Sequence, residues 1–511
     1  MNRLLAALAG VLATLAGVAA GHLVAALLDP ATSPVLTVGS QVIDLTPTPV
    51  KEWAISQFGD RDKPILIGSV LVGVVLLSAV AGLVARRRFA YGAGVLVLLV
   101  AVPATIALTR PAADPSAVVP SLVALVVGVA ALGWLVRSAR PASPSSSPSS
   151  SGASAAGSGP SRRGLLVAFG VVAGAAAVLG GAGRWVASYR SRGVDVDLPA
   201  AADPLAPLPR GLEERFPGIT PLQVPNDEFY RVDTRLDVPI VDHESWTLTI
   251  DGDVEREVTF TFDDLLAMDL VEKDITLTCV SNSVGGKYVG GARWLGVPLV
   301  ALLDRAGVGS RADQILSTDV DGMTISTPLA LATDGRDALL AVGMNGEPLP
   351  REHGFPARMV IPGLYGFISA TKWVTRMTLT TYADQDAYWT ERDWATDAPI
   401  KPSSRIDTPR ALADLDAGEN VIGGVAWAQF DGGVGRVQVR VDGGPWQDAE
   451  LGADVGNDYW RQWFLRWDAT PGQHRIASRV VDGDGDPQSP ARANPFPSGS
   501  SGIQELLVTV S

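Results

Sequence analysis

The segment that decides the fold runs from Ala341 to Gly366, AVGMNGEPLPREHGFPARMVIPGLYG. It places a histidine, His353, and a guanidinium, Arg358, among turn residues around a short apolar strand. Arg358 can bind an anion through two parallel hydrogen bonds, and Lys372, a little farther on, can add a point charge. The segment therefore indicates a site for a pyrophosphate-like group, although a single arginine is more often a surface ion-pair partner.

A second segment, Leu277–Asn282, ends a β-like run and contains Cys279, the only cysteine of the chain. Glycine pairs follow it at Gly285–Gly286 and Gly290–Gly291, so the sulfur can be held rigidly and face a cavity. A single cysteine excludes an intrachain disulfide, a zinc ribbon and an all-cysteine iron–sulfur site. By itself it is as well interpreted as a small buried apolar residue.

The composition divides the 511-residue chain near residue 190. Residues 1–190 hold 6 acidic and 14 basic residues, which leaves 48 acidic and 27 basic residues in the remainder, or net charges of +8 and −21. The second part is therefore an acidic soluble protein. Binding to nucleic acid needs clustered lysine and arginine, so that class of partner is excluded.

The first part contains five apolar stretches that are each near the length needed to cross about 30 Å of hydrocarbon. They are Leu4–Leu28, Pro64–Ala85, Ala90–Leu108, Val118–Val136 and Leu165–Val186. The first four predict an anchor in the lipid bilayer, and the fifth predicts either a further span or a cleavable signal. His22 is the one histidine in these stretches, so a haem with two axial histidines cannot be built from them, and a hydrogen bond between helices is the favoured role.

Arginines at the ends of these stretches predict the orientation of the chain. With a cytoplasmic N-terminus they all lie on one side, as the positive-inside rule requires: Arg86–Arg88, Arg137, Arg140, Arg162 and Arg163. We therefore expect a multi-pass protein of the cell membrane whose second part is extracytoplasmic. Ser161–Leu166 resembles a twin-arginine export signal, and an ordinary positive-inside pair is the alternative.

The acidic part reads as an α+β domain followed by a β-sandwich. Strands are predicted at Trp246–Ile250 and Glu257–Phe262, and helices at Phe262–Met268 and Pro298–Ala306. Beyond Pro402 the pattern changes to alternating strands, which include Arg436–Val441 and His474–Val481. Five tryptophans would supply much of the bulk of the sandwich: Trp427, Trp446, Trp460, Trp463 and Trp467.

The stretch Ala341–Arg358 closely resembles the molybdopterin-binding domain of the sulfite oxidase family. The resemblance covers about residues 216–385 and also takes in Asn226–Arg231, Cys279 with Ala292–Trp294, and Ile368–Trp373. The sandwich resembles the family's C-terminal dimerisation domain at Gly424–Trp427 and Val441–Gly444, so a homodimer through that domain is expected.

The resemblance implies a molybdenum–molybdopterin cofactor and a role for each matching residue. Cys279 would ligate molybdenum, and Cys279 and Arg231 would be the catalytic residues. The other implied cofactor contacts are Asn226, Tyr230 and Arg231 near the entry of the domain, His353 and Arg358 on the pterin and phosphate, and Ser369, Thr371 and Lys372 on the phosphate side. A soft thiolate suits such a metal, whose oxygen ligands perform two-electron oxygen-atom transfer.

Two departures from the family pattern limit what is implied about the substrate. Sulfite oxidases place paired arginines after the asparagine that follows the cysteine, but here Ser283 and Val284 follow Asn282. Their tyrosine before the Met-Asn-Gly turn is replaced around Val342–Gly343. The prediction of a pocket for an anionic substrate is therefore weakened. Sulfite-like oxidation and sulfoxide-like reduction of a small substrate both stay open. No cytochrome domain is fused to the chain, so a separate electron-transfer partner is expected.

Two further readings stay open beside this one. A turn at Tyr365–Phe367 and the export-like motif resemble periplasmic methionine sulfoxide reductase subunits, which lack the sandwich. A non-catalytic membrane scaffold or adhesion protein is the alternative of a different class, and a zinc or thiol hydrolase is poorly supported.

The predicted layout is a four-helix membrane region at 1–140, a linker at 141–163, a fifth helix at 164–188, a tether at 189–215, a catalytic domain at 216–400 and a β-sandwich at 401–511.

Overall fold

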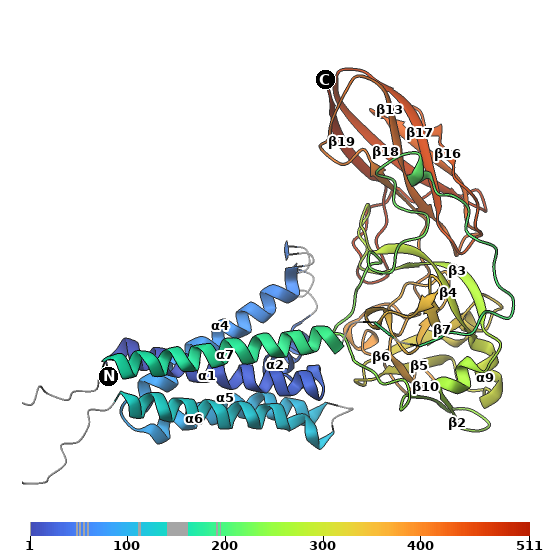
Figure 1. Ribbon diagram of the computed structural model, residues 1–511. Helices are drawn as coiled ribbons and strands as arrows, with labels where there is room; N and C mark the ends of the chain where they lie inside the picture. The colour runs from blue at the N-terminus through green and yellow to red at the C-terminus, as the bar shows by residue number, and fades with distance from the viewer. Residues whose placement is uncertain are drawn as a thin grey trace, which may run out of the picture. The chain divides into compact units, whose positions relative to one another are not determined.

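The computed structural model describes most of the chain as two compact units (Figure 1). The described residues are 2–47, 50, 53, 54, 57, 58, 61–110, 114–139, 162–190, 193, 194 and 196–511. The predicted linker Pro141–Pro160, together with Arg140 and Ser161 of the predicted positive side and export motif, lies outside them. One unit comprises Met1–Arg192 with Thr234–Ile240, and the other comprises Gly193–Asp233 with Val241–Ser511.

The first unit is helical. Among its described residues, five helices are long and apolar enough to cross a membrane, and each coincides with one of the five predicted stretches. The predicted spans are thus confirmed as long apolar helices. A shorter helix that was not predicted, α2, begins with a proline at its first position. The bounds are α1 (Arg3–Leu27), α2 (Pro34–Leu45), α4 (Asp62–Ala85), α5 (Phe89–Thr109), α6 (Val119–Ser138) and α7 (Arg162–Arg190).

Helix α1 packs against α4, α6 and α7. Small residues make this possible, because a Cβ at Gly10 would lie 2.0 Å from the carbonyl oxygen of Ser78. At the C-terminal end of α1, Arg190 Nη1 donates to the carbonyls of Ala26 and Leu27 at 2.6 and 2.8 Å. His22 Nδ1 lies 3.1 Å from the hydroxyl of Ser33, a hydrogen bond between α1 and the start of α2.

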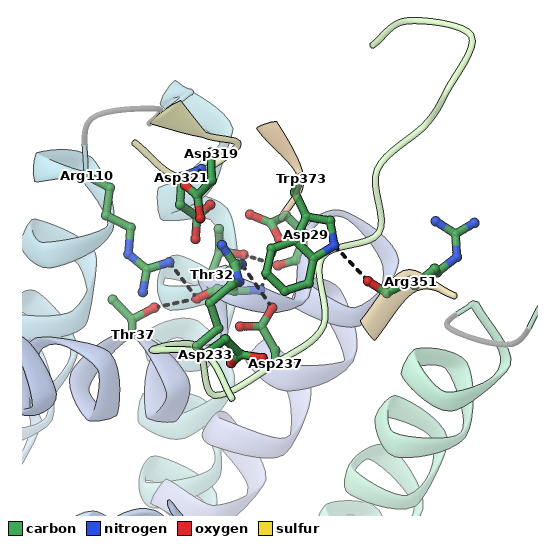
Figure 2. A network of polar contacts seen from close by, with 12 residues as sticks. Asp29, Thr32, Thr37, Arg110, Asp233, Asp237, Asp319, Asp321, Arg351 and Trp373 are labelled. Atoms are coloured by element: carbon green, nitrogen blue, oxygen red, sulfur yellow. Dashed lines mark hydrogen bonds and ion pairs between the residues drawn. The ribbon is translucent and has the colours of Figure 1, made fainter. Parts of the chain in front are cut away.

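The turn after α1 is closed by side chains from two other elements. Arg110 Nη1 and Thr37 Oγ1 both donate to the carbonyl oxygen of Ala31, at 3.2 and 3.1 Å (Figure 2). Backbone groups that a short 3₁₀ turn leaves unpaired are satisfied in this way.

The second unit begins with the predicted α+β domain, which holds two sheets. One has the order β2-β1-β10-β5-β6, and the other has the order β3-β4-β7-β8 with β9 paired to β7. The strands are β1 (Thr247–Gly252), β2 (Val258–Thr261), β3 (Val271–Thr278), β4 (Val289–Pro298), β5 (Gln314–Asp319), β6 (Thr324–Pro328), β7 (Leu339–Met344), β8 (Glu347–Pro348), β9 (Arg358–Val360) and β10 (Val374–Thr380), and the helices are α8 (Phe262–Leu266), α9 (Leu299–Ala306) and α10 (Leu329–Ala332).

The predicted strands and helices of this domain are found within a few residues of their expected bounds. Helix α8 begins with a capping box, in which Thr261 accepts from the backbone of Asp264 and the Asp264 carboxylate accepts from Thr261. The core between the sheets is dominated by residues such as Trp294, which is fully buried and donates its indole N–H to the carbonyl of Ile275 at 3.1 Å.

The C-terminal domain is the predicted β-sandwich. Its two sheets have the orders β11-β13-β17-β16 and β12-β19-β18-β14-β15. Val437 and Val439 are fully buried while Arg436 and Arg440 point outward, which is the alternation that predicted β14. The strands are β11 (Ser403–Thr408), β12 (Asp414–Leu415), β13 (Gly418–Trp427), β14 (Val434–Val441), β15 (Gln447–Asp448), β16 (Glu450–Leu451), β17 (Arg461–Ala469), β18 (Gly472–Asp482) and β19 (Gln504–Val510).

The sandwich is hydrogen-bonded to the sheet that carries the cysteine. Gln429 Nε2 donates to the carbonyl of Thr276 at 2.5 Å, and the Thr276 hydroxyl accepts from the backbone N–H of Trp460 at 2.9 Å. The indole of Trp460 in turn donates to Leu222 at 2.8 Å. These buried contacts tie β3 directly to the C-terminal domain.

Residues that precede the α+β domain also belong to this unit. Ala202 donates its backbone N–H to the carbonyl of Leu270 at 2.8 Å, and Leu205 donates to the carboxylate of Glu272 at the same distance. The side chains of Val194, Val196 and Leu198 pack against the core.

The core position of Trp294 yields a stability prediction. Replacing Trp294 by alanine leaves a cavity and an unpaired carbonyl, so the α+β domain should lose about 3–5 kcal/mol of unfolding free energy. Calorimetry of the full-length chain in detergent should show an earlier unfolding transition. Val308→Ala, at a side chain that is 38% exposed, is the control and should leave the transition in place; equal transitions for both variants would contradict the prediction.

Candidate functional site

Cys279 is the first residue after β3 and opens the connection Cys279–Tyr288 to β4. Its backbone N–H donates to the carbonyl of Tyr288 at 2.9 Å, so both ends of the connection are pinned together. The thiol is buried, and burial raises its pKa above the ordinary value while hydrogen bonds from Ser281 oppose the rise. Bonding to a metal ion would displace the thiol proton.

Arg358 opens β9 with its guanidinium in the protein interior. Nη1 donates to the carbonyl of His353 at 3.0 Å and Nη2 to the carbonyl of Ala370 at 3.4 Å, and the cation lies 5.1 Å from the ring centre of Trp294. Among the described residues, no carboxylate forms an ion pair with it. Burial lowers its pKa to about 10. A buried cation without a counter-charge costs several kcal/mol, so this site is suited to an anion that the chain does not itself supply.

Arg231 and Lys372 share one carboxylate, that of Asp233. Arg231 Nε lies 2.7 Å and Lys372 Nζ 2.9 Å from the same oxygen, Oδ2. Burial lowers the pKa of Lys372 to about 8, against the charge of Asp233, which favours the protonated amine. Asp233 therefore holds two of the predicted cofactor-binding cations in one place.

His353 ends the 3₁₀ turn Arg351–His353 that follows β8. Its Nε2 lies 2.9 Å from the carbonyl oxygen of Asn226, so Nε2 carries the proton and donates. Burial lowers the pKa of His353 to about 4, and the imidazole is therefore neutral at neutral pH. The same turn is held by Trp373, the residue before β10, whose Nε1 donates to the carbonyl of Arg351 at 2.8 Å (Figure 2).

Asn226 is placed by the Asn345–Gly346 turn between β7 and β8. Asn345 adopts a positive φ of 54°, and its side-chain amide donates to Asn226 Oδ1 and to the carbonyl of Val224, both at 2.9 Å. Asn226 donates in return to the carbonyl of Met344 at 3.3 Å. The turn of the deciding segment thus anchors the segment Asn226–Arg231, which carries other candidate residues.

Tyr230 lies near both Cys279 and Arg358. Burial raises the pKa of its phenol, and its two electrostatic neighbours are Cys279 and Arg358. The hydroxyl is therefore protonated and can donate a hydrogen bond. Electrostatic interactions connect six predicted site residues in one neighbourhood: Cys279, Tyr230, Arg358, His353, Arg231 and Lys372.

The hydroxyls of Ser369 and Thr371 are paired inside the protein. Ser369 Oγ donates to the carbonyls of Leu364 and Tyr365, both at 3.0 Å, and Thr371 Oγ1 lies 2.6 Å from Ser317 Oγ. Both residues are buried. Their hydroxyls support the turn that leads to Lys372, and their predicted contact with a phosphate stays a prediction.

Asp233, Asn345 and Tyr365 were not singled out from the sequence as site residues. Asp233 could have been suspected because a carboxylate two residues after Arg231 can fold back on it. Burial raises the pKa of Tyr365 to about 12, and Cys279 is one of its electrostatic neighbours. Val342, at one of the two departures, is fully buried in β7.

Comparison with known proteins agrees with this geometry. The family described as oxidoreductase molybdopterin binding domain matches residues 235–389. Rat mitochondrial sulfite oxidase is 32% identical over 288 residues, which are 47% of this chain and 52% of that protein. Human mitochondrial sulfite oxidase is 32% identical over 306 residues, or 50% and 56% of the two chains. The chain thus spans about half the length of the curated relatives it matches.

A second relative and a solved structure extend the comparison. The NADH nitrate reductase 2 of Nicotiana tabacum is 33% identical over 183 residues, covering 30% of this chain and 20% of that one. The crystal structure of the sulfane dehydrogenase SoxCD from Paracoccus pantotrophus superposes with a TM-score of 0.50 at 26% identity, over 56% of this chain and 81% of that one. The chain therefore carries a molybdopterin-binding oxidoreductase domain of the sulfite oxidase family.

Proposed function

We propose that this chain is a molybdenum-cofactor oxidoreductase that catalyses two-electron oxygen-atom transfer on a small substrate outside the cytoplasm. The observation that carries the proposal is the buried guanidinium of Arg358, which donates only to carbonyls among the described residues and lies in the same site as a buried thiol. An anionic cofactor with a metal would supply both the counter-charge and the bond to sulfur.

Different residues of the site suit the metal, the phosphate and the pterin of such a cofactor. Cys279 would ligate the metal as a thiolate, and Arg358 and Lys372 would bind the phosphate. Neutral His353 and the phenol of Tyr230 would hydrogen-bond the pterin, with Arg231 and Asn226 at the entry. The bound cofactor would supply oxygen-atom transfer and a two-electron reservoir.

The residues around these contacts keep the site dry and ordered. Asp233 keeps Arg231 and Lys372 in fixed positions, since both cations bond to one oxygen. Phe229 packs edge-on against His353 and Trp294, at 5.5 and 5.9 Å between ring centres. Interactions between charges are stronger where water is excluded, so this packing strengthens the hold on an anion.

The substrate class follows from the relatives and from the departures. The relatives include a sulfite oxidase and a sulfane dehydrogenase, so we propose a small sulfur-containing substrate. Ser283 and Val284 follow Asn282 where sulfite oxidases have paired arginines, and Val342 offers no hydroxyl. We expect a substrate with less negative charge than sulfite. Oxidation and sulfoxide-like reduction are both compatible with these residues.

The remaining parts of the proposal concern the setting of the enzyme. The long apolar helices would anchor it in the cell membrane, with the arginine-rich ends in the cytoplasm and the second unit outside. Electrons would pass to or from a separate partner protein. The motif around Arg162–Arg163 would direct export, and the β-sandwich would form a homodimer.

The first prediction concerns the metal ligand. Cys279→Ser should abolish the thiolate character of the Mo(V) electron paramagnetic resonance signal and lower activity with an artificial electron carrier at least about 100-fold. Ser310→Ala, at an exposed position outside this connection, is the control and should keep both. Metal analysis of chain from a molybdenum-replete host provides the reference; wild-type chain without molybdenum would favour a non-catalytic scaffold.

The second prediction concerns the anion. Arg358→Gln should lower the molybdenum retained after purification at least about tenfold, because a buried charge partner of the phosphate is lost. Arg336→Gln removes a guanidinium that is paired with Asp334 and should retain wild-type molybdenum. Equal retention in the two variants would show that Arg358 does not bind the cofactor.

The third prediction concerns pH. The pKa of His353 is 6.5 in the unfolded chain and about 4 in the folded one, so the unfolded chain binds more protons between these values. The unfolding free energy of the cofactor-free chain should therefore fall as pH drops from 6.5 to 4, by about 3 kcal/mol in total. His353→Gln should remove this part of the fall. Parallel pH curves for variant and wild type would refute the buried neutral histidine.

A further inference from the structure

We propose that the loop between β18 and β19, in the C-terminal sandwich, positions the metal-ligating cysteine and the phenol of Tyr365. This inference rests on the proposed function, and it assigns the sandwich a role inside the catalytic site. The loop spans residues 483–503 and reaches both chain segments that flank Cys279: the connection that follows it and the turn that contains Tyr365.

The first contact is with the connection Cys279–Tyr288. Ser500 Oγ donates to the carbonyl of Asn282 at 2.5 Å. Asn282 is itself bound to both ends of the connection, because its backbone N–H donates to the carbonyl of Cys279 at 3.0 Å and its Oδ1 accepts from Tyr288 at 2.9 Å. A displacement of Asn282 would therefore move the residue that carries the sulfur.

The second contact is with Tyr365. A Cβ at Gly499 would lie 2.4 Å from Cε2 of the tyrosine ring, so the glycine backbone is in close contact with the ring. Lys401 closes the arrangement, since its Nζ donates to the carbonyl of Gly499 at 2.6 Å and its backbone N–H to Tyr365 Oη at 3.4 Å. The adjacent Gly366 N–H donates to the carbonyl of Thr278 at 3.0 Å, one residue before Cys279.

The loop is itself anchored to the catalytic domain, so its contacts can hold Asn282 and Tyr365 in position. The ring of Phe496 packs edge-on against Trp394, with centres 5.2 Å apart, and Ala395 donates its backbone N–H to the carbonyl of Pro497 at 3.2 Å. The Gly499 N–H donates back to Pro495 at 2.6 Å. Phe496 and Pro497, which precede Gly499 and Ser500 in the loop, thus fix the loop to the catalytic domain.

The sandwich also supports the glycines of the same connection. Arg405 in β11 donates from Nη1 to the carbonyl of Gly286 at 3.1 Å, and its Nε bonds to Asp407 at 2.6 Å. A Cβ at Gly285 would lie 2.8 Å from the side chain of Gln504, at the start of β19. The connection that carries Cys279 is therefore held by the sandwich at three successive places: Asn282, Gly285 and Gly286.

The test compares two pairs of matched variants in the full-length chain. Gly499→Ala pushes a methyl group into Tyr365, whereas Gly485→Ala puts the same methyl group on a loop glycine with similar φ, +97° against +89°, and open space around it. Ser500→Ala removes the donor to Asn282, whereas Ser501→Ala removes the neighbouring hydroxyl, which bonds to Ala491. Ser500→Thr keeps the hydroxyl and serves as the rescue.

Two measurements are made. In the cofactor-free chain, labelling of Cys279 by a thiol reagent reports on this residue alone, because the chain has no other cysteine. In chain loaded with molybdenum, the Mo(V) resonance spectrum reports on the geometry at the metal. We expect Gly499→Ala and Ser500→Ala to speed labelling about fivefold and to alter the spectrum, with kcat lowered about tenfold and KM little changed. The two controls and Ser500→Thr should behave as wild type.

The outcomes separate this inference from the proposed function. If Gly499→Ala and Ser500→Ala match their controls in labelling rate and in spectrum, the positioning role is overturned while a molybdenum-loaded wild type keeps the function. If wild-type chain takes up no molybdenum, the proposed function fails. A faster labelling rate in the two variants alone would then still support the hold of the loop on Cys279.

Discussion

The guanidinium of Arg358 is the constraint on which the catalytic domain depends. It lies in the interior, bonded to the carbonyls of His353, Met359 and Ala370 and packed over Trp294, and no described carboxylate balances it. The fold accepts this cost because the surrounding groups are fixed: the accepting carbonyls come from the His353 turn and from the chain after β9, and Asn226 ties the His353 turn to the β7–β8 turn. Such an arrangement is stable only when an anion completes it or when the rest of the core compensates for the charge.

The second charged centre, formed by Arg231, Lys372 and Asp233, differs from Arg358 because it contains its own carboxylate. Asp233 neutralises much of the charge of Arg231 and Lys372, so these cations are held ready before any ligand binds. An anion that arrives at Arg358 gains a full counter-charge, whereas one that arrives at Lys372 must compete with Asp233. For the anion proposed above, Arg358 would supply most of the binding energy and the Asp233 centre would supply orientation.

Much of this could be anticipated from residues that are close in the sequence. The deciding segment contains a turn, a histidine, an arginine and a strand, and these interact mainly with their neighbours or with the segment Asn226–Arg231. The apolar helices are predictable because a long run of apolar residues has few alternatives to a membrane span. The alternation in β14 was readable for the same reason, since the periodicity of a strand is local. Ser369 and Thr371 were proposed for a phosphate, yet their hydroxyls are bonded within the protein, and no pattern in the sequence distinguishes the two uses.

The sequence by itself determined the class of domain, the five apolar helices, the sandwich and the choice of Cys279 as the candidate metal ligand. Each of these depends on a long motif or on a periodic pattern. Only the tertiary structure decided which groups surround that cysteine. Asp233 bonds Lys372 across 139 residues, and Ser500 bonds Asn282 across 218. Contacts over such distances depend on how sheets pack, and packing is selected by the whole core at once. A sequence read along one chain therefore singles out the cysteine, but not the loop residues that contact the segments on either side of it.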